Sequence, residues 1–296
     1  MRLTTILTFS LGLLAVCATC ACASEPNALS SGGSYIDIPW GNGFEGNADV
    51  TLGARYFLSY GPDLGHVLLS PTSWTSSDWA KFGVVAGLAA AVSDNDVNIQ
   101  RWVQRTRGKG SDTIARFAQP LGNGRYVFPS LGLAYCYGRI FGDEKLERAS
   151  LLGIESALVS SAVTGGIKYL AHKHRPLYLA AGEDDVPWSG PAFDGEDLSF
   201  PSGHTTVSFA VATVMASEYR DHRIVPPVAY GLASLVAFSR VNDNAHWLSD
   251  VIVGAAIGHF TAEAIERVHG GNDNGRLSFA PVVDNRGAGL ALSVKF

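Results

Sequence analysis

The stretch that decides the fold is residues 201–218, which reads PSGHTTVSFAVATVMASE. Its first four residues, Pro201-Ser202-Gly203-His204, have the pattern of a helix start, with a proline as punctuation and a serine that is a preferred N-cap. The run from Thr205 to Ala216 continues without a charged residue. The stretch therefore predicts an apolar helix that begins beside a histidine.

The helical pattern extends on both sides, from about Asp78 to His269. Apolar segments of helical length are separated by polar or Gly/Pro-containing stretches, at 79–93, 125–141, 150–171, 204–218, 224–239 and 247–266. After Gly270-Gly271, residues 277–283 and 289–296 flank Asp284-Asn285-Arg286-Gly287, which is the pattern of a β-hairpin. We expect an all-α fold, a helical bundle, with a short C-terminal β-hairpin that packs on the helices.

The first residues resemble a secretory leader. Arg2 precedes the mostly apolar run Ile6–Val16, and Ala21-Cys22-Ala23 has the pattern of a cleavage site before Ser24. Cysteines in this leader leave a lipid anchor open as an alternative. Cleavage would leave Cys136 as the remaining cysteine, which excludes an internal disulfide and a thiolate metal site. We divide the chain into a signal peptide (1–23), an N-terminal lead-in (24–74), the main domain (75–270) and a C-terminal tail (271–296).

Composition and charge narrow the class of protein. The 296 residues are 47% hydrophobic and 17% charged, and the mean hydropathy is +0.13. These values lie at the apolar edge of soluble proteins and short of a typical polytopic membrane protein. A formal net charge of -5 gives no electrostatic reason to expect a nucleic-acid partner.

The sequence leaves open whether the helices cross a bilayer. A span needs about 20 predominantly apolar residues, and Glu155, Lys168 and Asp250 interrupt the better segments. The loop 183–197 is acidic whereas the opposite helix ends are basic, which would place the loop outside. If the N-terminus is exported, a further membrane span near residues 53–70 is needed for the acidic loop to lie outside. A soluble or peripheral bundle is the alternative, and we favour membrane association.

Three clusters of polar residues carry the chemistry. The first is Lys168, six intervening residues, and Arg175-Pro176. Seven residues make two helical turns, about 10 Å along the axis, so both side chains are expected near one face at the end of an apolar helix. Two surface cations that match the helix dipole would explain the pair. An ammonium and a guanidinium also suit a phosphate group.

The second cluster is Pro201-Ser202-Gly203-His204. Free backbone N–H groups at a helix N-terminus bind oxyanions, and Gly203 would allow close approach. His204 would then stand beside a bound phosphate, where it can protonate a leaving alkoxide. An ordinary helix start capped by Ser202 is the alternative explanation.

The third cluster is Ser239-Arg240, five residues, His246, three residues, and Asp250. His246 and Asp250 are predicted at i and i+4 on the start of the last long helix. There the carboxylate can accept from one imidazole nitrogen and leave the other as a nucleophile. Arg240 would add a third positive group. A histidine–aspartate pair that only stabilises the helix is the alternative.

Taken together, the clusters resemble the type 2 phosphatidic acid phosphatase superfamily, which shares its site with vanadium haloperoxidases and bacterial non-specific acid phosphatases. The family pattern is K-x6-R-P, P-S-G-H and S-R-x5-H-x3-D. Each specified position is filled here, in order and at family spacing, between Lys168 and Asp250. The helical context extends the resemblance to about 75–268.

The resemblance implies a role for each residue of the pattern. Phosphate-binding groups are implied at Lys168, Arg175, Ser202, Gly203 and Arg240. His246 would attack phosphorus to give a phosphohistidine, Asp250 would orient it, and His204 would protonate the leaving group and then activate water. No metal and no cofactor are implied, because the cations supply the positive charge that Mg²⁺ supplies in other phosphoryl-transfer sites.

The expected function is that of a metal-independent phosphatase for phosphomonoesters or pyrophosphates, with a lipid phosphate as the favoured substrate. The expected place is the periplasmic side of a bacterial cell envelope, associated with the inner membrane or soluble in the periplasm. A soluble acid phosphatase of broad specificity, a vanadium-dependent haloperoxidase and a non-catalytic envelope protein are the alternatives.

Other residues are interpreted more simply. The acidic loop 177–200, which joins the first two clusters, is expected to be solvated, with a cover over the site as the alternative. His172 and His174 fit no spacing that the family uses. The remaining histidines are expected to be structural or solvated: His66, His222, His259 and His269.

Overall fold

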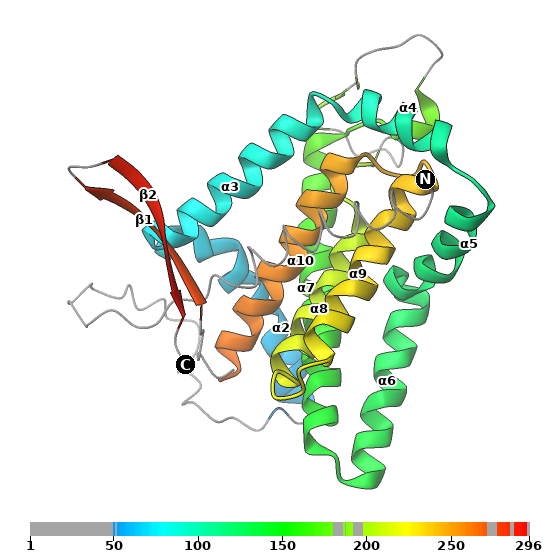
Figure 1. The fold of residues 1–296 in the computed structure, drawn as a ribbon. Helices are drawn as coiled ribbons and strands as arrows, with labels where there is room; N and C mark the ends of the chain where they lie inside the picture. Colours follow the sequence, from blue (N-terminus) through cyan, green and yellow to red (C-terminus); the bar gives the residue numbers. More distant parts are fainter. Residues whose placement is uncertain are drawn as a thin grey trace.

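The computed structural model describes residues 50, 52–179, 186, 188–191 and 198–270, and the backbone of 277–284 and 287–294. The predicted signal peptide and most of the acidic loop lie outside these ranges. Within them the chain is a bundle of α-helices (Figure 1). The α-helices are α2 (Ala54–Leu69), α3 (Ser76–Ser93), α4 (Asp96–Thr106), α5 (Lys109–Ala118), α6 (Gly124–Phe141), α7 (Glu144–Ala171), α8 (Gly203–Glu218), α9 (Val225–Asn242) and α10 (Leu248–Val268). Short 3-10 helices are η1 (Ser70–Ser73), η2 (Gln119–Gly122) and η3 (Pro176–Tyr178). The predicted helical fold is confirmed for the described part of the chain.

Helix α8 is the centre of the bundle and packs against α7, α9 and α10 (Figure 1). Its side chains Phe209 and Val214 are fully buried. Phe209 belongs to a core cluster with Tyr230 of α9, and Val214 belongs to another with Leu152 of α7 and Ile265 of α10. Because apolar side chains cover it from three helices, the nearly uncharged sequence of α8 is stabilised by burial on all sides.

The backbones of α8 and α10 approach each other closely at two glycines. A Cβ at Gly254 would lie 2.6 Å from the carbonyl oxygen of Ser202, and one at Gly258 would overlap the carbonyl oxygen of Thr206. A residue without a side chain is needed for this approach. The contact also lets the Ser202 N–H donate to the carbonyl oxygen of Asp250 at 3.0 Å. The core itself therefore joins the second and third sequence clusters.

The end of α7 differs from the expectation. The helix ends at Ala171, and His172 adopts a left-handed conformation with φ of 48°. Arg175 follows in extended backbone, with φ of -80° and ψ of 151°. The prediction that Lys168 and Arg175 share one helical face is wrong, because the helix ends between them.

The start of α10 also differs. The helix begins at Leu248 with Trp247 as its N-cap residue, so the prediction that His246 lies on this helix is wrong. The backbone N–H groups of Ala245 and His246 both donate to the carbonyl oxygen of Arg240, at 3.0 and 3.2 Å. This tight turn at the end of α9 sets the position of the histidine.

Three helices were not among the expected apolar segments. Helices α4 and α5 carry many polar residues and cover the end of α9, and α5 packs along it. Helix α2 lies within the segment 24–74 that was assigned to a lead-in, and it packs against α7 and α10. The domain limits themselves stay predictions.

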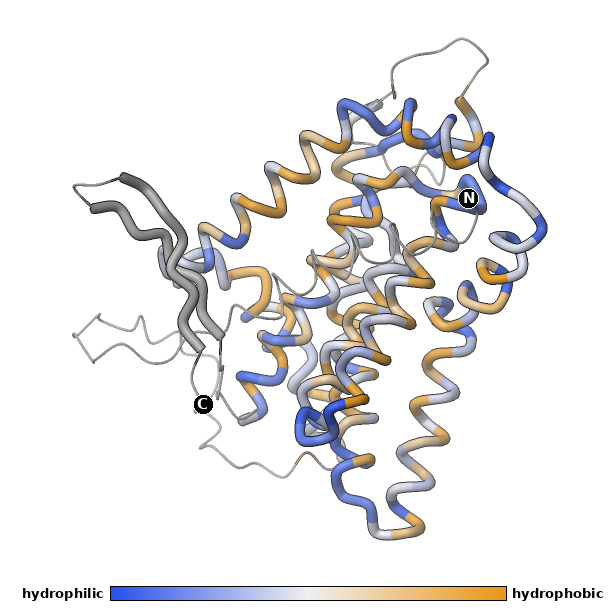
Figure 2. Tube along the Cα trace, in the orientation of Figure 1, coloured by the Kyte–Doolittle hydropathy of each residue, from blue (hydrophilic) through white to orange (hydrophobic). Residues whose placement is uncertain are grey.

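Two helices, α7 and α10, are long and apolar enough to cross a membrane by length and composition. The bundle buries 56% of the apolar segment of α7 and 61% of that of α10, as expected for helices in a core. Large hydrophobic side chains are instead exposed on the outer helices, where Figure 2 shows hydrophobic positions recurring along α3 and α6. On α5 and α6 they include Phe117, Leu133, Tyr137, Ile140 and Phe141.

Two β-strands follow the bundle. The backbone of β1 (Leu277–Asp284) pairs antiparallel with that of β2 (Gly287–Val294), with Leu277 opposite Val294. No side chain of these strands is described. The C-terminal hairpin and its packing as a flap on the helices therefore stay predictions.

Candidate active site

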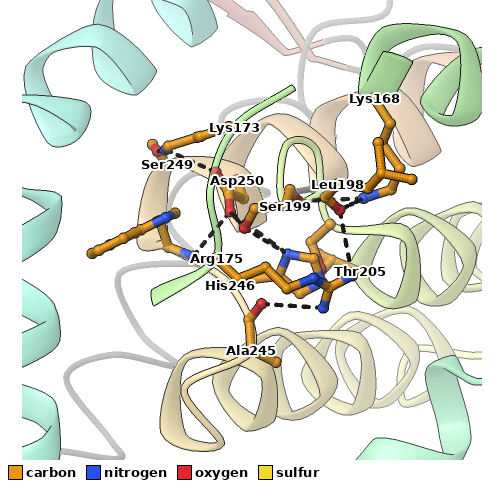
Figure 3. A network of polar contacts seen from close by, with 12 residues as sticks. Lys168, Lys173, Arg175, Leu198, Ser199, Thr205, Ala245, His246, Ser249 and Asp250 are labelled. Carbon is orange, nitrogen blue, oxygen red and sulfur yellow. Dashed lines mark hydrogen bonds and ion pairs between the residues drawn. The ribbon is translucent and has the colours of Figure 1, made fainter. Parts of the chain in front are cut away.

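The residues of the three sequence clusters meet at one end of the bundle. The N-terminal ends of α8 and α10 and the C-terminal ends of α7 and α9 lie at this end, because helices that follow one another in the chain from α7 to α10 run antiparallel (Figure 1). Figure 3 shows Lys168, Arg175, His246 and Asp250 close together there. The arrangement adds the partial positive charges of two helix N-termini to those of the side chains.

His246 is buried, and Asp250 lies behind it. The imidazole Nδ1 is 3.6 Å from Asp250 Oδ2 and 3.5 Å from the hydroxyl oxygen of Ser199. Asp250 Oδ2 accepts from the Ser199 hydroxyl at 2.6 Å and from the Trp247 N–H at 3.0 Å. The carboxylate is thus held in place by two donors, and its distance to the imidazole is longer than a hydrogen bond.

A buried lysine holds the other oxygen of Asp250. Lys173 Nζ donates to Asp250 Oδ1 at 2.9 Å, to Asp96 Oδ2 at 2.8 Å and to Ser249 Oγ at 2.8 Å (Figure 3). Lys173, Asp96 and Asp250 all have fully buried side chains. Each N–H of the ammonium has an acceptor, which a buried cation requires. Lys173 therefore connects α4 to the aspartate behind His246.

Two cations point toward the loop before α8. Lys168 Nζ donates to the carbonyl oxygens of Leu198 at 2.6 Å and Ser199 at 3.3 Å. The Arg175 guanidinium donates to the carbonyl oxygens of Leu198 and Ala245, both at 3.4 Å. These acceptors are neutral, so they leave both positive charges available to an anion.

Arg240 is the third cation and lies in the last turn of α9. Its Nε donates to the Ser239 hydroxyl at 3.0 Å, and its Nη2 forms an ion pair with Asp243 Oδ2 at 2.7 Å. Asp243 is partly exposed, with 33% of its side chain accessible. An anion at the site would compete with this carboxylate for the guanidinium.

The first turn of α8 supplies backbone donors. Ser202 is the N-cap residue but makes no side-chain cap hydrogen bond, and its hydroxyl oxygen accepts from Thr205 at 3.0 Å. A Cβ at Gly203 would meet no described atom within 4 Å. No described atom therefore covers this side of Gly203, and the free N–H groups of the first turn can bind an oxyanion there.

His204 lies beside this turn. Its Nε2 is 3.5 Å from the Gln119 side-chain nitrogen in η2. A Cβ at Gly122 would lie 2.6 Å from the His204 carbonyl oxygen, so η2 packs directly on the histidine backbone. Burial, and then the charge of Arg240, lower the pKa of His204 to about 4. The imidazole is therefore neutral at neutral pH when no anion is bound.

The other titratable groups of the site respond to the same surroundings. Burial lowers the pKa of His246 to about 4, which keeps the imidazole neutral. Burial alone would raise the pKa of Asp250, but His246 and the ammonium of Lys173 lower it to about 2. Burial, and then Arg175, lower the pKa of Lys168 to about 8, so it is still mainly charged at neutral pH. A neutral imidazole backed by an ionised carboxylate is the state that a nucleophile needs.

All eight predicted site residues lie in this region, around the ends of four helices. Sequence reasoning missed the residues that support them: Asp96, Gln119, Lys173, Ser199, Asp243 and Ser249. Lys173 and Ser249 lie between motif positions in the sequence, and this place was a weak sign that they belong to the site. Asp96 is on α4, far from the motifs in sequence, and no spacing rule could have found it.

The site is rich in cations and offers few metal ligands. Among the described residues, the group of side chains that could hold a metal ion is Asp63, Glu155 and His269. Glu155 and Lys168 are both on α7, and thirteen residues of helix span about 20 Å. A metal at that group would not touch the phosphate-binding residues.

Comparison with known proteins agrees with this geometry. Residues 150–272 match the model of the PAP2 superfamily, which covers the helices α7 to α10 that build the site. A crystal structure of the first transmembrane PAP2 type phosphatidylglycerolphosphate phosphatase from Bacillus subtilis superimposes with a TM-score of 0.50 and 18% sequence identity. The match covers 63% of this chain and 92% of that one. At this identity the likeness concerns the fold alone.

Two proteins of known sequence are similar to part of this chain. "Probable diacylglycerol pyrophosphate phosphatase 1" of Schizosaccharomyces pombe is 30% identical over 168 residues, which are 47% of this chain and 60% of the relative. "Lipid A 1-phosphatase" of Porphyromonas gingivalis is 46% identical over 66 residues, which are 22% of this chain and 15% of the relative. The chain thus spans less than two thirds of the length of both relatives.

Proposed function

The chain belongs to the PAP2 superfamily, and on this premise we propose that it is a phosphatase that hydrolyses lipid-linked phosphomonoesters or pyrophosphates through a phosphohistidine. One observation carries the proposal. His246 is buried and neutral with Asp250 behind it, and the cations and the open N-terminus of α8 lie beside it. This arrangement combines a nucleophile with an oxyanion cage.

In the first step, His246 Nε2 attacks phosphorus. Asp250 faces Nδ1, which favours the tautomer with the proton on Nδ1 and leaves the Nε2 lone pair for attack. A P–N bond forms while the P–O bond to the leaving group breaks, and the proton of His204 passes to the leaving oxygen. The imidazole of His246 becomes cationic, and the charge of Asp250 stabilises it.

In the second step, water replaces the histidine. His204, now neutral, accepts a proton from water, and the water oxygen attacks phosphorus as the P–N bond breaks. Inorganic phosphate leaves, His246 is neutral again, and His204 loses its proton to the departing phosphate or to solvent. In the next turnover a bound substrate monoanion raises the proton affinity of His204, which burial and the surrounding cations lower in the free protein, and supplies the proton that His204 donates.

Charge stabilisation is the task of the phosphate-binding groups. Lys168 and Arg175 contact only neutral carbonyl oxygens in the hydrogen bonds described above, so a phosphoryl group can replace these acceptors. Backbone N–H groups at Gly203 add donors that are fixed before the substrate binds. Such groups cost no reorganisation as charge develops in the transition state. No step of this mechanism requires a metal.

The substrate class is inferred from two features. The curated relatives are named for diacylglycerol pyrophosphate and lipid A 1-phosphate, both lipid phosphates. Exposed apolar side chains on α3, α5 and α6 supply a surface that a membrane would cover. We infer an enzyme of the cell envelope that acts at a membrane surface, with the periplasmic side as the expected location.

The test is phosphate release by the purified chain in detergent with EDTA present. The panel contains a long-chain lipid phosphate, a polyprenyl pyrophosphate and a small soluble phosphomonoester, and His246→Ala is the control. We expect turnover of the lipids that is lost in His246→Ala. Preference for the soluble ester would favour a soluble acid phosphatase instead. Inactivity on all three substrates would overturn the proposal, and vanadate-dependent bromide oxidation would then test the haloperoxidase alternative.

A phosphohistidine can be trapped directly. Quenching the enzyme with alkaline detergent during turnover of ³²P-labelled nitrophenyl phosphate would leave a label that is stable to base and labile to acid, as for a phosphoramidate. His204→Ala should increase this label, because this leaving group needs little protonation in the first step whereas the second step is slowed when no base activates water. Turnover of lipid phosphate by His246→Ala at the wild-type rate would contradict the mechanism.

A further inference from the structure

A second cluster of ionisable side chains lies at the opposite end of α10 from His246. It consists of Asp63 of α2, Glu155 of α7 and His269, which follows α10. The side chains of Asp63 and His269 are each 7% exposed, and that of Glu155 is fully buried. Three helices that are distant in sequence therefore each bring one ionisable group to a single buried point.

The distances within the cluster are long for charge-assisted hydrogen bonds. His269 Nε2 is 3.2 Å from Glu155 Oε2, 3.3 Å from Glu155 Oε1 and 3.5 Å from Asp63 Oδ2. Charge-assisted bonds between these groups are shorter, about 2.7–2.9 Å. One N–H also points in one direction and cannot serve three oxygens.

The same distances fit a set of metal ligands. With bonds of about 2.0–2.2 Å, tetrahedral ligands around Zn²⁺ lie about 3.3 Å from one another. The Nε2 of His269 and the nearest oxygens of Glu155 and Asp63 are separated by 3.2 and 3.5 Å. All the candidate ligand atoms lie within 4.8 Å of one another. One ion could contact all three residues with little movement.

Several oxygens at this point have no hydrogen bond. Within the described residues, Asp63 Oδ2, Glu155 Oε2 and the Tyr56 hydroxyl are buried without a hydrogen-bond partner. The Tyr56 ring is 5.8 Å from the ring of His269. Buried polar atoms are normally hydrogen-bonded, and here Asp63 Oδ2 and Glu155 Oε2 share a single imidazole nitrogen at ion-pair distance, so the group makes fewer hydrogen bonds than buried groups of this kind usually do.

We propose that Asp63, Glu155 and His269 bind a divalent first-row transition metal ion, with Zn²⁺ as the expected ion. Two carboxylates and one imidazole match the ligand types of Zn²⁺, whereas Ca²⁺ and Mg²⁺ prefer oxygen ligands alone. Two negative charges also balance the charge of the ion. The fourth position is left to water or to the Tyr56 hydroxyl.

The role of this ion is to stabilise the fold. It would connect α2 and α7 to the end of α10, because each of these elements supplies one ligand. The cluster lies about 20 Å from the phosphate-binding residues along α7, so the proposal does not depend on the proposed phosphatase activity. It assigns a function to His269, which the sequence alone placed among the structural or solvated histidines.

The competing explanation is a proton in place of the metal. An imidazolium between two carboxylates would then stabilise the same contact. A metal must displace this proton, so binding of Zn²⁺ should release protons and strengthen as the pH rises.

The experiment uses the full purified chain, stripped with a chelator and then dialysed. Zn²⁺ is titrated by calorimetry in two buffers of different ionisation enthalpy, and the melting temperature is measured with and without the ion. We expect one Zn²⁺ per chain, proton release on binding, and a melting temperature that rises by several degrees. Absence of both binding and a thermal shift in the wild-type chain would overturn the proposal.

Variants locate the ion. Glu155→Gln and His269→Ala should abolish stoichiometric binding, whereas His222→Ala, a change at an exposed histidine, should not alter it. If a variant fails to fold, Co²⁺ added to the stripped wild-type chain gives a second measurement, because its visible absorption reports nitrogen and oxygen ligands in a tetrahedral site. Zn²⁺ binding that survives in both Glu155→Gln and His269→Ala would place the ion elsewhere and overturn the assignment.

Discussion

At the residue scale, the proposed nucleophile and the proposed proton donor differ in their surroundings. His246 is buried with an aspartate behind Nδ1, whereas His204 stands beside the N-terminus of α8 and Gln119. Both imidazoles have a pKa lowered to about 4. The lowered pKa has a different consequence for each proposed role. It keeps His246 neutral and able to attack phosphorus, and it leaves His204 without a proton to donate until an anion binds.

The first prediction concerns the leaving group. His204→Ala should lower kcat on alkyl phosphates by about 100- to 10,000-fold, the usual contribution of a general acid. A nitrophenyl phosphate needs little protonation, so formation of the phosphohistidine from it should be nearly unchanged. Stopped-flow release of nitrophenol measures this first step. An equal loss on both substrates in the first step would show that His204 has another role.

The second prediction concerns pH. His246 must be neutral to attack, so kcat/KM should fall as the pH drops toward about 4, where the free imidazole protonates. A substrate monoanion can supply the proton that His204 lacks, and phosphate monoesters lose this proton near pH 6. The profile should therefore be bell-shaped with an acidic optimum between these limits. A flat profile from pH 5 to 9 would contradict this assignment.

The same two histidines should make folding stability depend on pH. Burial lowers the pKa of both in the folded chain from an ordinary value of 6.5 to about 4, so the unfolded chain binds more protons between about pH 4 and 6.5. Stability is then fully present above this window and decreases as the pH falls through it. Chemical unfolding at several pH values distinguishes this loss from the kinetic effect above.

At the scale of elements, buried ion pairs and close helix contacts place the site. Lys173 lies after the end of α7 and links Asp96 of α4 to Asp250 of α10. The aspartate behind the nucleophile is therefore held by an element outside the motifs. Three aromatic rings, those of Trp188, Phe200 and Trp247, lie within 5.7 Å of the ammonium.

Lys173 is thus predicted to be a positioning residue. Lys173→Met would leave two buried carboxylates without their cation, which costs about 3–5 kcal/mol of stability. It should also lower kcat more than it changes KM, and move the acid limb of kcat/KM to higher pH, because a positive charge near His246 is lost. Lys173→Arg should restore part of both effects. A variant with lower stability but an unchanged pH profile would indicate a structural role alone.

The contact between α8 and α10 gives the next prediction. Gly258→Ala would drive a Cβ into the carbonyl oxygen of Thr206, and overpacking of this kind costs about 1–3 kcal/mol. Gly132→Ala on α6 is the matched control, because a Cβ there meets no atom within 4 Å and alanine favours the helix. Urea unfolding should give a lower free energy of unfolding for Gly258→Ala and a higher one for Gly132→Ala, each compared with the wild-type chain. If Gly258→Ala left the free energy of unfolding unchanged, α8 and α10 would be able to move apart at this point without loss of stability.

At the scale of the whole molecule, the order of antiparallel helices gathers four helix ends into one site and leaves an apolar exterior. Phe117, Leu133, Ile140 and Phe141 are 76%, 72%, 75% and 68% exposed on α5 and α6. A chain in water rarely exposes so many large apolar side chains along neighbouring helices. This surface lies away from the core helices α7 and α10, which the bundle itself covers.

The last prediction is that this exterior binds membranes. Replacing Leu133, Ile140 and Phe141 by serine should reduce cosedimentation with vesicles of phosphatidylethanolamine and phosphatidylglycerol. Turnover of a small soluble ester, if the chain accepts one, should be unchanged, because none of these residues is near His246. The wild-type chain remaining in the supernatant would show that the surface has another function.

The sequence by itself determined the helical class, and its motifs predicted the site residues. Local patterns decide these, because helix periodicity, a capped helix start and motif spacing are all read within a few turns of chain. The three motifs supplied every residue expected around the phosphate, and Figure 3 shows Lys168, Arg175, His246 and Asp250 among them close together.

Tertiary structure alone decided which residues support them. Whether α7 continues to Arg175 or ends at Ala171 depends on packing that overrides local periodicity. The partnership of Lys173 with Asp96 joins residues far apart in the chain, as does that of Glu155 with Asp63 and His269. Burial makes each of these contacts strong, since ionisable groups removed from water must find partners, and burial is a property of the assembled core rather than of any segment.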